Sequence, residues 1–257
     1  MAGVSPLSNR WSKQVLSNFE QAATTYNSQA QLQRAIAWRL ARQCARQPIP
    51  AGFWVDLGSG TGLMADALEA CNPDQAVLRV DGCPEMLKHQ HITSSSQLWD
   101  LNVGLPSWPT SPSLLASSFA LHWLINPLER LHEWMAALTP EGWLALALPV
   151  EGSFPQWHQA AATAGVSCTA LPFPSQASLL DVLSSNNIRH QQLHQFTQQS
   201  PEVFQLLKPM RQIGAQASPC PTMGVGNWRH LKQAWPRCQN SGDAQLTWLI
   251  QLLLIQR

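Results

Sequence analysis

The six cysteines of this 257-residue sequence are scattered, and no two of them form a C-x-x-C pair. The sequence therefore predicts neither a zinc knuckle nor a redox dithiol, and we expect no bound metal. The chain also lacks an excess of charge, since 16 Lys and Arg balance 15 Asp and Glu and the net charge is +1. This balance gives no global field that would draw the protein onto nucleic acid or an anionic membrane, so an acidic partner must be met by a local patch.

Long apolar runs are missing as well. Residues 1–11 lack the apolar run of about 7 to 15 residues that marks a signal peptide, and no stretch reaches the roughly 18 apolar residues of a membrane span. Together with the reduced cysteines, these absences predict a cytoplasmic protein. Apolar residues still make up 45% of the chain, which suits one large α/β core better than two independent domains.

Apolar periodicity changes along the chain as expected for a parallel sheet with connecting helices. Residues 13–46 are predicted to form two helices, which Pro48 and Pro50 end. A strand at 53–57, a glycine turn, a helix at 63–71 and a strand at 76–80 then form a βαβ unit. The later expected strands lie at 114–121, 142–150, 188–196 and 244–256, and the later helices at 127–138, 154–164, 175–184, 201–213 and the end of an irregular segment at 215–235.

Three glycines follow the first predicted strand, in the segment WVDLGSGTG at residues 54–62. Glycines let the backbone approach a ligand and adopt φ values that other residues disfavour. The pyrophosphate of a dinucleotide sits at a helix N-terminus in folds of this kind. The carboxylate of Asp56 would be too close to that negative charge, so Asp56 argues against a dinucleotide ligand. The G-x-G-x-G spacing also differs from the G-x-G-x-x-G dinucleotide motif. A ligand with an amino-acid moiety, such as S-adenosylmethionine, fits this turn better.

Two further acids follow later predicted strands. Asp81 ends the second strand, where an acid accepts hydrogen bonds from ribose hydroxyls in both dinucleotide and S-adenosylmethionine binders. Asp100 precedes Leu101 at the expected end of the next strand, where it would accept from an adenine amino group. The alternative for Asp100 is a helix or loop cap, and the spacing alone does not separate the two.

The motifs of this chain, and their order along it, resemble those of the class I methyltransferases. They comprise D-L-G-x-G-T-G, Asp81 with Pro84-Glu85-Met86-Leu87, the segment 100–106, and Leu138-Thr139-Pro140-Glu141-Gly142. A closer similarity covers nearly the whole chain, which resembles the malonyl-acyl-carrier-protein O-methyltransferases of biotin synthesis. It rests on Phe19-x-x-Ala22-Ala23-x-x-Tyr26 with Ala30 and Gln33, Ala120-Leu121-His122-Trp123, Gly152-Ser153-Phe154-Pro155-x-Trp157, Leu207-x-x-Met210-Arg211-x-Ile213-Gly214-Ala215 and Leu231-x-x-Ala234-Trp235-Pro236.

The resemblance implies a Rossmann-like, seven-stranded and mostly parallel sheet with helices on both faces. It implies a helical segment at 1–50 over the cofactor site and a methyltransferase domain at 51–257 with a cap-like helical insertion around 165–235. S-adenosyl-L-methionine is the implied cofactor. The residues expected to bind it are Asp56, Gly58, Ser59, Gly60, Gly62, Asp81, Gly82, Met86, Asp100 and Leu101.

On this resemblance the reaction is methylation of the free carboxylate of a malonyl thioester, which needs no general base because the carboxylate is already an anion. Tyr26, the sole tyrosine, is the expected catalytic residue, a phenol that orients the substrate carboxylate or the cofactor. His122 and Trp123 are assigned to the substrate side, His122 as a structural histidine and Trp123 as pocket wall. Arg211 is a candidate bidentate anchor for the carboxylate, with an ordinary surface arginine as the alternative.

The implied partner is an acidic acyl carrier protein bound by a monomer. Two groups of arginines are candidates for its docking patch: Arg34, Arg39, Arg42 and Arg46 in one helix, and Arg189, Arg229 and Arg237 later in the chain. Two other functions remain open. One is a class I methyltransferase acting on a small free carboxylic acid or other metabolite, and the other is a catalytically idle S-adenosylmethionine-binding protein.

The chain departs from the family pattern in three places. Ser59 stands where cysteine is usual in the glycine turn. The acid common at the start of strand four is missing from Ser113-Leu114-Leu115, and no basic residue precedes Pro140, where Ala137-Leu138-Thr139 stands. The missing acid mildly favours the idle protein among the alternatives.

Overall fold

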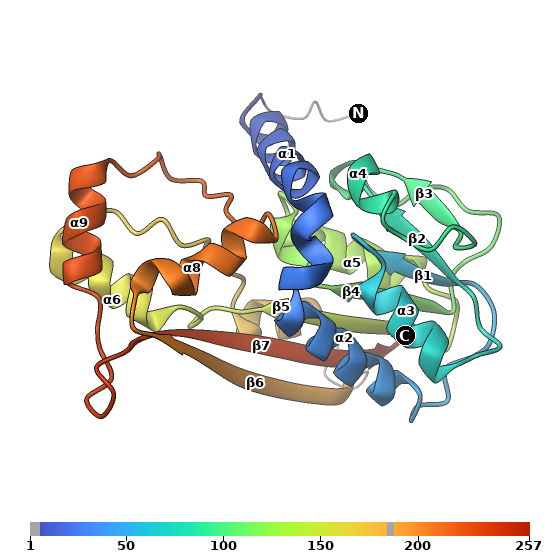
Figure 1. Ribbon diagram of the computed structural model, residues 1–257. Coiled ribbons are helices and arrows are strands. Elements are labelled where there is room, and N and C mark those ends of the chain that lie inside the picture. The colour runs from blue at the N-terminus through green and yellow to red at the C-terminus, as the bar shows by residue number, and fades with distance from the viewer. Residues whose placement is uncertain (1–5, 184–187) are drawn as a thin grey trace.

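The computed structural model describes residues 6–183 and 188–257, and its centre is a seven-stranded sheet of order β3-β2-β1-β4-β5-β7-β6 (Figure 1). Strand β7 runs antiparallel to both of its neighbours, β5 and β6, and the remaining neighbouring strands pair in parallel. The expected Rossmann-like, mostly parallel sheet is thereby confirmed. The strands are β1 (Trp54–Leu57), β2 (Val77–Asp81), β3 (Ser96–Leu98), β4 (Leu114–Ser118), β5 (Trp143–Pro149), β6 (Ile188–Ser200) and β7 (Ala244–Gln256).

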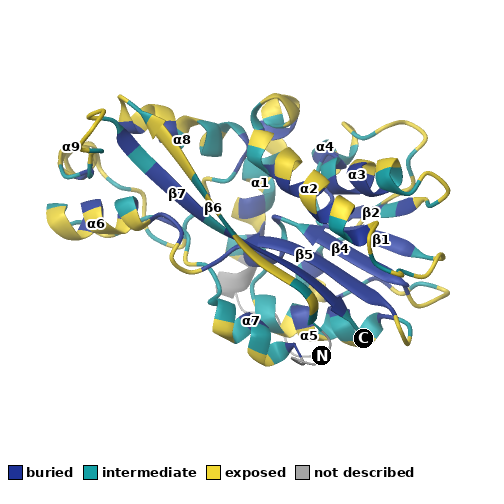
Figure 2. Cartoon of the chain, turned by 90° about the horizontal axis from the view of Figure 1, so that it is seen from below, coloured by how far each residue is buried: buried dark blue, intermediate teal, exposed yellow. Residues whose placement is uncertain are grey.

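Helices cover both faces of the sheet, as Figure 2 shows. On one face α2 (Gln31–Cys44), α3 (Leu63–Cys71) and α6 (Pro155–Ala164) pack on alternate residues of the strands, while α5 (Pro127–Ala137) and α7 (Gln176–Val182) pack on the other. Every residue of β5 is buried, which explains its unbroken apolar sequence. The remaining helices are α1 (Pro6–Gln29), α4 (Pro84–Leu87), α8 (Val203–Gln212), α9 (Val225–Gln233) and the 3-10 turns η1 (Leu101–Val103) and η2 (Leu121–Trp123).

Two predicted strands have the wrong length. The strand expected to reach residue 121 ends at Ser118, because Phe119 takes a positive φ of 57° that leaves the β region and residues 121–123 form η2. The strand expected at 188–196 continues to Ser200, because each residue from His190 onward pairs with β7 along the open edge of the sheet. The apolar pattern of the sequence did not indicate this extension, because side chains on an edge strand stay largely exposed and can be polar.

The range 165–235, expected as one helical insertion, contains α7 and strand β6 of the sheet. Helices α8 and α9 follow β6 and lie near the far end of the long β6 and β7 strands (Figure 1), where their buried residues join the core on the α2, α3 and α6 face. Helix α1 leads directly into α2 and runs past α4 and α8, and it contacts both of them. The domain division at 1–50 and 51–257 stays a prediction.

Candidate functional site

Asp56 lies at the end of β1 and is completely buried. Its Oδ2 accepts a hydrogen bond of 3.1 Å from the backbone N–H of Ala65 in the first turn of α3, while its Oδ1 is buried and has no partner among the described residues. Burial raises the pKa of Asp56 from 3.8 to about 7, against the lowering effects of the Ala65 amide and of Arg79. Burial therefore makes Asp56 harder to ionise than a carboxyl group in water.

The glycine turn between β1 and α3 requires its glycines for more than one reason. Gly58 has φ +71°, and a Cβ added there would lie 2.2 Å from the Cβ of Ala120. Gly60 has φ +53° and open space where a Cβ would point. The first glycine thus lets two loops meet at the edge of the sheet, and the second leaves room beside the cavity.

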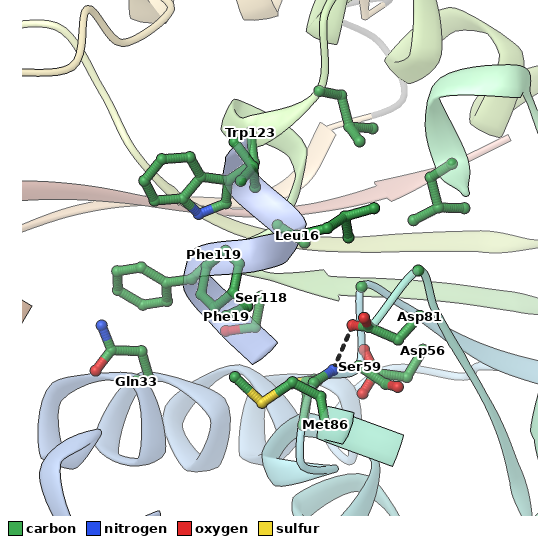
Figure 3. A pocket seen from close by; sticks show the side chains of 18 of the residues that line it. Leu16, Phe19, Gln33, Asp56, Ser59, Asp81, Met86, Ser118, Phe119 and Trp123 are labelled. Carbon is green, nitrogen blue, oxygen red and sulfur yellow. Dashed lines mark hydrogen bonds between the residues drawn. The ribbon is translucent and has the colours of Figure 1, made fainter. Parts of the chain in front are cut away.

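Asp81, at the end of β2, is hydrogen-bonded to this turn. Its Oδ2 accepts from the N–H of Gly60 at 2.7 Å, the bond dashed in Figure 3, and its Oδ1 accepts from the N–H of Cys83 at 2.7 Å. Burial raises the pKa of Asp81, and the amides of Cys83 and Gly60 oppose that rise. Each carboxylate oxygen keeps a lone pair free for a further donor.

Asp100 follows β3 by two residues and precedes η1. Its Oδ1 accepts from the N–H of Asn102 at 2.9 Å, so the cap that was one alternative for Asp100 is present. Its Oδ2 accepts from the hydroxyl of Ser12 on α1 at 3.3 Å. Asp100 nevertheless lines the same cavity as Asp56 and Asp81, and it links that cavity's rim to α1.

One cavity collects most of the residues expected to bind the cofactor. It lies at the carboxyl ends of β1, β2 and β4, where ligands bind in open α/β sheets, and α1 covers it. Figure 3 shows the acids at one end and aromatic side chains at the other. Its lining includes the expected residues Tyr26, Asp56, Gly58, Ser59, Gly60, Asp81, Gly82, Met86, Asp100, Leu101 and Trp123.

A second cavity adjoins the first and has a mostly aromatic wall. The two cavities share five lining residues, namely Phe19, Tyr26, Gln33, Phe119 and Trp123. The rest of the wall comes from η2, α6 with its N-cap Phe154, α8, β7 and the segments 169–173 and 213–217, and it includes His122, Trp157, Phe173, Met210 and Trp248. No Lys or Arg belongs to the lining of either cavity in the part of the chain that is described.

Tyr26 lies at the junction of the two cavities, near the C-terminal end of α1. Burial raises the pKa of its phenol above the usual value, and the negative charges of Asp81 and Asp56 raise it further. The phenol thus keeps its proton at any physiological pH and is a hydrogen-bond donor. Phe19 packs beside it, with ring centroids 6.5 Å apart.

His122 is buried in η2 and faces the aromatic cavity. Its ring lies edge-on to Phe173, with centroids 5.4 Å apart, and its Nδ1 has no partner among the described residues. Burial lowers the pKa of His122 from 6.5 to about 3, so the ring is neutral near pH 7. Trp123 is wall to both cavities and accepts at its carbonyl from the indole N–H of Trp11 at 2.9 Å.

Two expected site residues lie outside the cavities. Gly62 lines neither cavity and instead precedes α3 as its N-cap, with a left-handed backbone. Arg211 is exposed in the last turn of α8 and lines neither cavity, although its neighbour Met210 lines the aromatic one. The structure thus offers no anchor geometry for Arg211, because a helix directs neighbouring side chains about 100° apart and Met210 takes the inward direction.

Several lining residues carried no signal in the sequence. Gln33 lay within the family resemblance but had no assigned role, and Phe119 lay inside a predicted strand. Phe119 has a positive φ, which is a strained backbone conformation for this residue type. Its phenyl ring lines both cavities, so the strain lies at the candidate site. By contrast, Ser113, where the family's acid is missing, stands at the amino end of β4 and lines neither cavity.

Two other kinds of feature are absent from residues 6–183 and 188–257. None of the helices there is both long and apolar enough to cross a membrane. The same residues hold no group of three or more His, Cys, Asp or Glu side chains arranged to bind a metal ion.

Known proteins match both the sequence and the fold. A family described as "Methyltransferase domain" matches residues 55–146. The chain is 27% identical to the malonyl-[acyl-carrier protein] O-methyltransferase of Herminiimonas arsenicoxydans, with 88% of this chain and 87% of that protein covered. It is 23% identical to the protein of the same name from Marinomonas sp., covering 96% and 94%.

Solved structures share the architecture at lower identity. A Bacillus halodurans protein superposes with a TM-score of 0.59 at 15% identity over 85% of this chain and 97% of that chain. An S-adenosylmethionine-dependent methyltransferase from Thermotoga maritima superposes with a TM-score of 0.52 at 16% identity over 93% and 99%. These likenesses concern the fold.

The chain is an S-adenosylmethionine-dependent methyltransferase with the class I fold. Over most of its length its sequence resembles the malonyl-acyl-carrier-protein O-methyltransferases.

Proposed function

We propose that this methyltransferase esterifies the free carboxylate of a malonyl thioester on an acyl carrier protein, a step in making a biotin precursor. The observation that carries the proposal is the junction of the two cavities. An acid-lined cavity at the sheet edge adjoins an aromatic cavity without charged walls, and Tyr26 and Gln33 line both. That arrangement suits an acceptor with one charged end and an otherwise apolar, acyl-like body. The names of the relatives support the same acceptor.

The acid-lined cavity fits S-adenosylmethionine. Asp81 would accept from ribose hydroxyls through its free lone pairs, and the unpartnered Oδ1 of Asp56 would favour a nearby cation. Gly58, Ser59, Gly60, Gly82, Met86, Asp100 and Leu101 would complete the wall. When bound, the cofactor supplies a methyl group on a positively charged sulfonium.

The side chains at the junction are suited to bind and orient a carboxylate and not to remove a proton. A malonyl carboxylate with a pKa of about 4 is already ionised at neutral pH, so no base is required. Tyr26 keeps its proton and would donate a hydrogen bond to one carboxylate oxygen, and the side-chain amide of Gln33 would donate to the other. His122 is neutral and serves as wall.

The aromatic cavity would exclude water from the acceptor. Its rings leave few polar groups to retain water beside the reacting carboxylate, and a desolvated carboxylate is a stronger nucleophile. Neutral donors at the junction would orient the anion without holding it as tightly as an arginine would. Alignment and exclusion of water are thus the roles left to the protein.

A methyl-transfer assay on purified malonyl-acyl-carrier protein tests the proposal. We expect the malonyl group to gain one methyl group, measured by mass spectrometry of the carrier, and acetyl-carrier protein to gain none because it lacks the carboxylate. Methylation of acetyl-carrier protein, or no turnover of malonyl-carrier protein by an enzyme that binds the cofactor in calorimetry, would contradict the proposal.

The assay also separates the two alternatives. Turnover of malonyl-coenzyme A or free malonate at the rate seen with the carrier substrate would favour a small-metabolite methyltransferase. Cofactor binding without turnover of any thioester would favour an idle binding protein.

A further inference from the structure

Basic side chains are concentrated in two segments that contain no acid. Residues 21–55 hold four arginines, and residues 203–237 hold five Lys and Arg, while neither segment holds any of the chain's 15 Asp and Glu. The remaining residues carry seven of the 16 basic side chains and all 15 acids. A net charge near zero thus conceals two regions that would attract an acidic partner.

The arginines of the first segment are mostly engaged within the protein. Arg34 donates to the carbonyl of Asn27 at 2.8 Å. Arg39 contacts His194 at 3.2 Å and lies 5.3 Å above the ring of Phe196. Arg42 lies over the ring of Trp38 at 5.8 Å. These contacts fix the guanidinium groups along α2 and the β6 edge.

The second segment offers freer cations in a regular pattern. On α8 Phe204, Lys208 and Arg211 are exposed at i, i+4 and i+7, so they share one face of the helix. Within the described residues these two cations make no ion pair or hydrogen bond through their side chains. Phe204 is 60% exposed, which is unusual for a ring of that size on a helix.

Helix α9 repeats the pattern. Val225, Trp228, Arg229 and Lys232 stand at i, i+3, i+4 and i+7, and all are exposed. Val225 is 73% exposed and Trp228 is 37% exposed. Lys232 lies 3.5 Å from Glu202 in an exposed pair, and Arg229 makes no such pair in the part of the chain described. Each helix thus presents apolar side chains followed by cations.

These helices flank part of the wall of the aromatic cavity. Met210 of α8 lines it, and so do Ile213, Ala215, Gln216 and Ala217 of the segment that leads from α8 towards α9. A partner seated on α8 and α9 would therefore lie beside the acceptor cavity. Helix α2, which carries the other arginines, contributes Gln33 alone to the described lining of that cavity.

We propose that the exposed faces of α8 and α9 form the docking surface for a small acidic protein that carries the thioester on a flexible arm. This inference rests on the proposed function, since the acyl carrier is the acidic partner. The cations steer and orient it, and Phe204, Val225 and Trp228 provide apolar contacts within the charged surface.

The double variant Lys208→Glu/Arg229→Glu tests the surface against a matched control on α2, Arg42→Glu/Arg46→Glu. Kinetics are measured with malonyl-carrier protein and with malonyl-pantetheine, which has the arm but no protein. For the α8 and α9 variant we expect KM for the carrier substrate to rise roughly three- to thirtyfold, with a weaker dependence on salt, and malonyl-pantetheine turnover to stay at the wild-type level. The α2 control should keep wild-type KM for both substrates.

Three results would overturn the inference. Equal losses on both substrates would mean damage to the cavity, and loss of carrier turnover in the α2 control alone would move the surface to α2. A KM unaffected in Lys208→Glu/Arg229→Glu would also refute it. Failure of the wild-type enzyme itself to methylate malonyl-carrier protein would instead refute the proposed function, and the docking inference with it. Phe204→Ser is an independent variant, expected to raise KM for the carrier substrate without changing its dependence on salt.

Discussion

Replacing Asp56 with asparagine should change how the stability of the ligand-free protein depends on pH. Burial raises the pKa of Asp56 from 3.8 to about 7, so between these values the folded protein holds a proton that the unfolded chain has lost. The unfolding free energy contributed by this group therefore falls as pH rises through that window and levels off above it. From about pH 5 to about pH 8 the fall amounts to about 2–3 kcal/mol.

A second buried group works in the opposite direction. The pKa of His122 falls from 6.5 to about 3, so in that window the unfolded chain binds the proton that the folded protein excludes. Stability contributed by His122 therefore rises with pH, by about 2 kcal/mol from about pH 5 to about pH 8. In the wild-type protein the two slopes largely cancel.

Asp56→Asn removes the contribution of Asp56 to the pH dependence of the unfolding free energy and leaves that of His122. Asparagine keeps the acceptor that bonds the Ala65 amide and has no proton to lose. We expect the difference in unfolding free energy between the variant and wild type to move in the variant's favour by about 2–3 kcal/mol from about pH 5 to about pH 8. Urea unfolding followed by tryptophan fluorescence at several pH values measures it.

His122→Asn is the matched control, because its difference from wild type should drift with pH in the opposite sense. The reasoning is refuted if the difference between Asp56→Asn and wild type is constant across the whole pH range, whatever its size. A constant difference would mean that Asp56 has the same pKa in the folded and unfolded chains.

The same geometry makes three further predictions. Tyr26→Phe should lower kcat/KM for malonyl-carrier protein about ten- to a hundredfold through the loss of one donor, with cofactor affinity in calorimetry unchanged; an equal loss of cofactor affinity would assign the phenol to the cofactor instead. Asp81→Asn should weaken cofactor binding by about 1.5–3 kcal/mol in the same calorimetric assay, and wild-type affinity would show that the ribose is held elsewhere. Gly58→Ala should destabilise the protein by about 2–4 kcal/mol in thermal unfolding, because its Cβ would collide with Ala120 in a backbone of positive φ, while an unchanged midpoint would mean that the turn relaxes freely.

Sequence patterns predicted those parts of the fold that depend on local periodicity. The helix expected at 63–71 and the strand expected at 244–256 have those bounds in the structure. The helix buries one apolar face against the sheet, and the strand is apolar because both of its faces are covered. The strand at 114–121 was predicted too long, because the reversal at Phe119 depends on the site around it and not on apolar pattern.

The acid-lined cavity was predictable for a related reason. Its acids and glycines end consecutive strands, and parallel strands bring their carboxyl ends to one edge. The aromatic cavity was not, because its wall combines single residues of α1, α2, α6, α8 and β7 that are far apart in sequence. Arg211 illustrates the limit, since its charge suggested a role that its direction on α8 does not allow.

Helix α1 has a kinetic consequence. It lines both cavities, and at its far end the hydroxyl of Thr25 donates to the carbonyl of Gln212 at 2.8 Å, while Gly214 packs against its backbone at Asn18 and Phe19. One helix therefore covers both cavities. Loss of its contacts with Gln212 and Gly214 should expose the two cavities together, which hydrogen exchange along α1 would measure.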